Sequence, residues 1–218
     1  MPDYTDYASS VWVGIGCTVT GGKSLCFDDV TLVGSPAPPP CVPTEGTAGT
    51  TFTMERSGFG NDGGTVSFVD TKASLKVSSW NDSTITCLVS KAPLPGAYGV
   101  SVQPKGGQAR VYPAAFTVQP PAIDTVDPAT GAVGATVTVT GSFFTTKKGK
   151  IYLVGNGPKG IIAKSGKVIT WTMDPATGVS SATFAVPKGL STGSPCDVKI
   201  VLKGMPEAVA TDAFTIMP

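Results

Sequence analysis

Five cysteines are the side chains with the most chemistry to offer in this chain of 218 residues, which contains no histidine. The absence of histidine removes the commonest general base and metal ligand. No two cysteines form a C-x-x-C pair, so a thiolate metal site is not expected. Disulfide formation is the chemistry that remains, and we expect no catalytic residue, no metal and no cofactor. The cysteines are Cys17, Cys26, Cys41, Cys87 and Cys196.

Two disulfides are candidates on spacing. A turn at residues 20–23 would place Cys17 opposite Cys26 in a hairpin, where opposed Cβ atoms lie about 4.5–5.5 Å apart, slightly wide of the ~3.8 Å mean for disulfides. Cys41 with Cys87 is the second candidate pair. Cys196 is then the odd thiol, which we expect to be buried and reduced, because free cysteine is among the most buried residue types.

The composition favours many short strands. Glycine (27 residues) and proline (19 residues) are abundant, as in chains with many tight turns. Charged residues make up 14% of the chain and the net charge is +1, so neither nucleic acid nor an acidic membrane is an expected partner. No apolar run approaches the ~20 residues of a membrane span, and the N-terminus lacks a signal-peptide pattern. We expect a removed signal or another export route.

The chain repeats itself at an offset of 85 residues. Pro43, Gly46 and Gly49 recur at the same spacing in the second half, and each set is followed by an alternating apolar and threonine run and then a phenylalanine. Self-similarity of this length predicts an array of like modules. The second set is Pro128, Gly131 and Gly134.

Each copy is expected to form an all-β sandwich. In the second copy, seven short alternating segments lie between clusters of glycine, proline and aspartate or asparagine, as a two-sheet sandwich requires. The first copy matches it segment by segment, with Trp80 standing for Trp171. Their equivalent positions indicate a shared core role for these two tryptophans rather than a sugar-stacking pair.

These segments resemble the IPT/TIG family of immunoglobulin-like domains over residues 37–218. The shared features are the Pro-x-x-Gly-x-x-Gly opening, the threonine-rich strand, the tryptophan before an x-Thr-Ile-Thr strand and the closing Phe-Thr-Val. Arg56 departs from the pattern, because Gly141 holds the corner glycine in the second copy. The resemblance implies tandem Ig-like sandwiches and a cell-surface or extracellular setting in bacteria. It implies no activity.

Residues 10–34 predict a β-hairpin around Thr20–Lys23. Residues 21–33 align without gaps to residues 106–118, so we interpret this segment as the last two strands of a further, partial repeat. The predicted domains are therefore 1–34, 35–119 and 120–218. The apolar face of the hairpin needs a cover. It could pack on the first module, complete a sheet in a neighbouring chain, or reflect a longer array.

The same N-terminal region holds the predicted partner surface. Trp12 has no equivalent in a core, and with Tyr4 and Tyr7 it makes the arm the most aromatic exposed candidate. The interface candidates share this arm and hairpin: Tyr4, Tyr7, Val11, Trp12, Val13, Ile15, Leu25 and Phe27.

These patterns favour a non-enzymatic structural or adhesion protein of the cell surface. In its sharper form the hypothesis is a subunit of an extracellular filament that associates with itself, or with other surface proteins, through the N-terminal strands. One alternative is an accessory carbohydrate- or protein-binding module of a larger surface enzyme or receptor, with a glycan as partner. Another is a phage virion or decoration protein.

Overall fold

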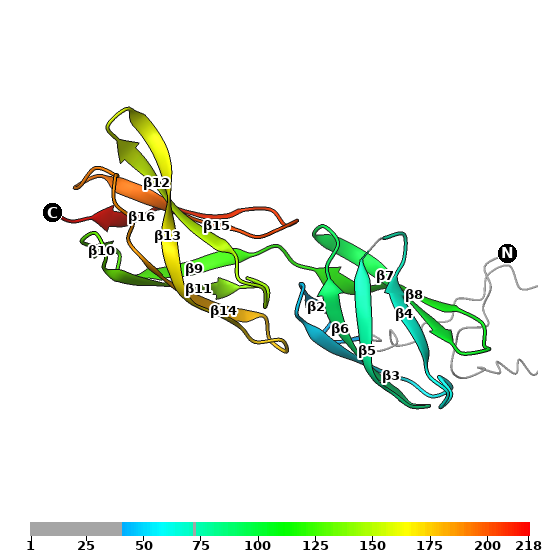
Figure 1. The fold of residues 1–218 in the computed structure, drawn as a ribbon. Helices are drawn as coiled ribbons and strands as arrows, with labels where there is room; N and C mark the ends of the chain where they lie inside the picture. Colours follow the sequence, from blue (N-terminus) through cyan, green and yellow to red (C-terminus); the bar gives the residue numbers. More distant parts are fainter. Residues whose placement is uncertain (1–40, 72) are drawn as a thin grey trace, which may run out of the picture. The chain divides into compact units, whose positions relative to one another are not determined.

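The computed structural model describes residues 41–71 and 73–218, which form two β-sandwiches (Figure 1). The predicted all-β architecture with tandem Ig-like domains is confirmed. The predicted hairpin at residues 10–34 lies outside the described residues. Within the described part, no helix has the length and apolarity needed to cross a membrane.

The first sandwich is built from two four-stranded sheets, β1-β3-β6-β5 and β2-β8-β7-β4. All pairs are antiparallel except β2 with β8. Its strands are β1 (Cys41–Val42), β2 (Glu45–Gly46), β3 (Thr51–Glu55), β4 (Gly64–Phe68), β5 (Ser74–Trp80), β6 (Thr84–Lys91), β7 (Gly96–Pro104) and β8 (Arg110–Val118).

The second sandwich repeats this strand order, as β9-β11-β14-β13 and β10-β16-β15-β12. Here β13 pairs with both β12 and β14, so the two layers form one continuous eight-stranded sheet. Its strands are β9 (Ala122–Asp127), β10 (Thr130–Gly131), β11 (Thr136–Ser142), β12 (Lys150–Gly157), β13 (Gly160–Met173), β14 (Val179–Ala185), β15 (Pro195–Val201) and β16 (Ala208–Ile216).

Alternation along the strands builds each core. In β3 the threonines at 51 and 53 are partly exposed while Phe52 and Met54 are fully buried, because successive side chains point to opposite faces of a sheet. In β11 Val137 and Val139 are buried in the same way. Each sandwich has its own apolar cluster, the first around Phe52 and Phe116 and the second around Phe184 and Phe214.

A long hairpin distinguishes the second sandwich from the first. The sequence predicts strands at 150–154 and 168–171, but β12 continues to Gly157 and β13 begins at Gly160 (Figure 1). Only Pro158 and Lys159 connect the two strands, and Gly160 has a φ of 107°, which glycine adopts without strain. The glycines and proline of this stretch resemble a loop in sequence, which is why the hairpin was not predicted.

The two tryptophans pack in the same way in both sandwiches. The indole N–H of Trp80 donates to the carbonyl of Gly60 at 2.9 Å, and its ring meets Phe59 edge to face. Trp171 donates to the carbonyl of Thr145 at 2.9 Å and packs on Phe144. Both rings lie against the core of their sandwich, so the core role predicted from the repeat is confirmed.

A glycine leaves room for each tryptophan. A Cβ added at Gly64 would come within 2.7 Å of the Trp80 ring, and one at Gly149 within 2.9 Å of the Trp171 ring. Gly64 and Gly149 are again 85 residues apart. The repeat therefore preserves a complete packing unit of phenylalanine, glycine, tryptophan and carbonyl.

We predict that Trp171→Phe lowers the free energy of unfolding by about 2 kcal/mol, because it removes the indole hydrogen bond and part of the buried ring. Urea unfolding followed by circular dichroism measures this change. Ile169→Thr, at a site 53% exposed on the same strand, is the control and should stay within about 0.5 kcal/mol of wild type. Equal unfolding midpoints for Trp171→Phe and wild type would contradict the role of the indole.

Candidate functional site

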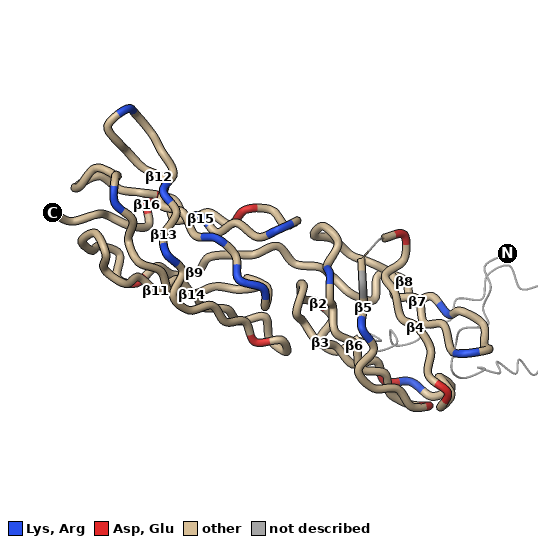
Figure 2. Tube along the Cα trace, in the orientation of Figure 1, with Lys and Arg blue, Asp and Glu red and all other residues tan. Residues whose placement is uncertain are grey.

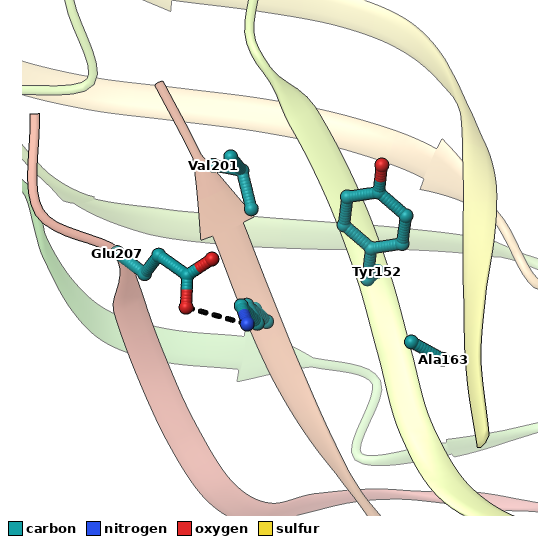
Figure 3. Close-up of a pocket in the computed structure, with 5 residues that line it drawn as sticks. Tyr152, Ala163, Val201 and Glu207 are labelled. Atoms are coloured by element: carbon teal, nitrogen blue, oxygen red, sulfur yellow. Dashed lines mark ion pairs between the residues drawn. The ribbon is translucent and has the colours of Figure 1, made fainter. Parts of the chain in front are cut away.

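A shallow hollow of about 210 Å³ lies on the outer face of the second sandwich, over β12, β13, β15 and the turn that precedes β16 (Figure 3). Figure 3 shows the Tyr152 ring with Val201 and Ala163 on either side of it, and Glu207 reaching towards β15. The hollow is lined by Tyr152, Ala163, Lys199, Val201 and Glu207.

Strand alternation and register place these side chains together. Ile151 and Leu153 are buried, so Tyr152 between them points outward from β12. Val198 and Ile200 are buried on β15, which turns Lys199 outward in the same way. Tyr152 pairs directly with Lys199, so the two side chains are cross-strand neighbours.

An ion pair borders the hollow. The Lys199 ammonium lies 2.5 Å from the Glu207 carboxylate, and the two side chains are 29% and 49% exposed. An ion pair this exposed contributes less than about 1 kcal/mol to stability. Its main effect is to hold one positive and one negative group at the edge of the Tyr152 ring.

The Tyr152 hydroxyl has no hydrogen-bond partner within residues 41–71 and 73–218, although the ring is half-buried. An aromatic face beside paired donors and acceptors can hold a ligand that has an apolar face and polar edges. In the described part of the chain no cluster of three or more histidine, cysteine, aspartate or glutamate side chains could hold a metal ion.

The first sandwich lacks this surface. Ser67 on β4 holds the register position of Tyr152, and Ser101, its cross-strand partner on β7, holds that of Lys199. The hollow is therefore a property of the second sandwich. The sequence carried a signal for it, because a tyrosine replaces a serine at equivalent positions of two otherwise matching repeats.

The interface residues predicted from the sequence all lie outside the described residues, as do Cys17 and Cys26. The proposed assembly through residues 10–34 therefore stays a prediction. Arg56, which replaces the corner glycine, lies in the described part and stacks over the Tyr112 ring, with its guanidinium carbon 5.6 Å from the ring centroid. Gly141, by contrast, passes close to the carbonyl of Ala122, which explains the glycine in the second copy.

The disulfide expected between Cys41 and Cys87 is absent from the structure, where both are free, fully buried thiols. The sheet order explains their separation. Cys41 on β1 pairs with Met54 of β3, and Cys87 on β6 pairs with Phe52 of the same strand. Because β3 lies between them, the two cysteines are about 9.6 Å apart across the sheet, and they are also displaced by two residues along β3, which puts them beyond the reach of a disulfide. Cys196 is a buried free thiol, as expected.

Residues 39–118, the first sandwich, match the family model of the IPT/TIG domain. This region is an IPT/TIG domain, as the sequence predicts. The place of the second sandwich in the same family rests on its matching strand order and packing unit, and we treat it as a proposal. No curated protein sequence matches the chain.

Several solved structures are similar to this chain in fold. A protein named SGBP-B, from a xyloglucan utilization locus of Bacteroides uniformis, has 22% identity and a TM-score of 0.38 over 81% of this chain and 47% of its own. The surface glycan-binding protein PbSGBP-B of Prevotella bryantii has 17% identity and a TM-score of 0.32, over 77% and 37%. A gamma-CGTase from alkalophilic Bacillus clarkii has 13% identity and a TM-score of 0.34, over 76% and 22%. The chain thus spans less than half the length of each.

The buried thiols lead to a prediction about alkaline stability. Burial and, to a smaller extent, the charge of Cys87 together raise the pKa of Cys41 to about 12, and burial raises the pKa of Cys87 to about 12. Since an unfolded thiol has a pKa near 9.0, their stabilising contribution is complete below pH 9 and is lost as the pH rises from 9 towards 12. We expect Cys41→Ala/Cys87→Ala to show a shallower decline in unfolding free energy between pH 9 and 11 than wild type.

Urea titrations at each pH measure this difference, and Cys196→Ala is the control for the loss of a thiol in the other sandwich. A thiol assay should also find Cys41 and Cys87 unreactive at pH 8 until urea unfolds the protein. The prediction is contradicted if the unfolding free energies of wild type and the double variant fall in parallel with pH. Rapid reaction of these thiols in the folded protein would also contradict it, because it would show that the thiols are accessible.

Proposed function

We propose that this chain is a non-enzymatic binding module of a surface protein and that it holds carbohydrate in the hollow at Tyr152. The observation that carries the proposal is a half-buried aromatic ring on an open sheet face, bordered by the ion pair of Lys199 and Glu207. The resemblance of the first sandwich to IPT/TIG domains supports the surface setting.

The chemistry of the hollow suits a sugar ring. A pyranose has an apolar face of C–H groups and a rim of hydroxyls. The Tyr152 ring offers a flat apolar surface of comparable size, while Lys199 can donate and Glu207 can accept hydrogen bonds at its edge. Val201 and Ala163 extend the apolar floor without blocking access from solvent. A shallow, open surface of this kind fits a segment of a polymer rather than an enclosed small molecule.

The filament hypothesis does not compete for this surface. It depends on residues 10–34, whereas the hollow is built from β12, β13, β15 and the approach to β16. A module that binds glycan can also be part of an assembly.

We predict that Tyr152→Ala weakens polysaccharide binding at least tenfold, which corresponds to about 1.4 kcal/mol, because the stacking surface is lost. Affinity electrophoresis against a panel of neutral and acidic polysaccharides, including xyloglucan, mixed-linkage glucan and polygalacturonate, would identify the ligand. Isothermal titration would then give the affinity.

Ser67→Ala is the matched control, since it changes the same register position in the first sandwich. It should bind as tightly as wild type. The proposal fails if wild type binds no polysaccharide of the panel, or if Tyr152→Ala, shown to be folded by circular dichroism, binds as well as wild type.

A further inference from the structure

The hollow at Tyr152 is bordered by lysines on three strands. Lys150 precedes Tyr152 by two residues and so lies on the same face of β12, about 7 Å along the strand. It pairs with Val201, which lines the hollow. Lys199 lies directly across from Tyr152 on β15.

Lys167 extends this positive edge onto β13. Lys167 is the first residue of β13 beyond its last pair with β12, Ile151 with Gly166, and it pairs with Ala185 of β14. Lys150 and Lys167 are both exposed. Two positive charges therefore lie next to this end of the β12–β13 ladder, where they favour a negative ligand.

Nearby groups leave most of this charge uncompensated. In the region that the structure describes, Lys199 is the one lysine with a carboxylate within 4 Å, that of Glu207. The Lys148 ammonium donates to the carbonyl of Val168 at 3.1 Å, which holds a further positive charge beside Lys167. Asp197, the other acid on this face of β15, accepts a hydrogen bond from the backbone of Asp212 on the side away from Lys150.

The positive charge is specific to the second sandwich. Residues 120–218 contain nine lysines and no arginine against six acidic residues, a net charge of +3, whereas residues 35–119 have a net charge of +1. Figure 2 shows the basic residues of the second sandwich spread over the tip of the β12–β13 hairpin, β13, β15 and the segment that leads into β12. Of these lysines, Lys150 and Lys199 lie on the sheet face that carries the aromatic ring.

We propose that the ligand of this face is an acidic polysaccharide, with one sugar on the Tyr152 ring and its carboxylate or sulfate groups on Lys150, Lys167 and Lys199. This inference rests on the proposed carbohydrate function and names the class of glycan. Two features favour a glycan over nucleic acid. The face has a single aromatic ring, whereas proteins that bind single-stranded nucleic acid stack several bases on aromatic side chains. It also has no arginine, the side chain that binds phosphate through two parallel hydrogen bonds.

The proposal also predicts a substitution that strengthens binding, at Glu207. An anionic group that approaches Lys199 must compete with the Glu207 carboxylate and is repelled by it. Glu207→Gln should therefore strengthen binding of an acidic polysaccharide by several fold. It should not strengthen binding of a neutral polymer, which gains nothing from the removal of a negative charge.

The test compares polygalacturonate with the same polymer after reduction of its carboxyl groups, by affinity electrophoresis and titration calorimetry on the full chain. Wild type should bind the acidic form at least tenfold more tightly. This preference should weaken as salt is raised from about 50 mM to about 500 mM, because salt screens the attraction between exposed charges. Lys150→Gln/Lys167→Gln should lose most of the preference. Lys76→Gln/Lys105→Gln, which removes the same charge from exposed sites of the first sandwich, should keep it. Chondroitin sulfate distinguishes sulfate from carboxylate recognition.

The outcomes separate the two proposals. Equal binding of the acidic and reduced polymers, with loss of both in Tyr152→Ala, would overturn the acidic ligand and leave the carbohydrate function intact. Binding of no polysaccharide would overturn both. Tighter binding of single-stranded DNA than of any acidic glycan would overturn the ligand class, and unchanged or weaker binding of polygalacturonate by Glu207→Gln would overturn the role given to Lys199.

Discussion

A side chain on a β-strand can face only the core or the solvent, and neighbouring side chains must take opposite faces. This constraint determines both the core of the second sandwich and the hollow on its outer face. Burial of Ile151 and Leu153 stabilises the second sandwich, and it forces Tyr152 onto the outer face. The same alternation on β15 turns Lys199 towards Tyr152. A shift of one residue in β12 would place the tyrosine in the core, and the same shift in β15 would turn Lys199 inward; either would remove the hollow.

Much of the fold could be predicted because the chain contains two repeats that can be compared with each other. Val66 and Phe68 of β4 correspond to Ile151 and Leu153 of β12 at the offset of 85 residues, so each repeat supports the strand assigned in the other. The β12–β13 hairpin has no counterpart in the first repeat. The first repeat therefore offered no comparison for residues 155–167, where hydrogen bonds between β12 and β13 extend both strands.

The candidate site was harder to predict for a physical reason. In an alternating strand, an outward tyrosine looks like any solvent-facing residue until the neighbours across the sheet are known. Glu207 contributes from a turn before β16, and its pairing with Lys199 depends on how that turn closes. The prediction of a disulfide between Cys41 and Cys87 was wrong for a related reason. Sequence spacing cannot show that β3 lies between the strands that carry them.

The two sandwiches differ in how their layers are joined. In the first, β4 and β5 belong to separate sheets, and the layers meet through side-chain packing and connecting loops. In the second, β13 runs without interruption from β12 to β14, so one hydrogen-bonded ladder links both layers. Sliding of one layer over the other would break main-chain hydrogen bonds as well as apolar contacts. The second sandwich is therefore the more shear-resistant of the two.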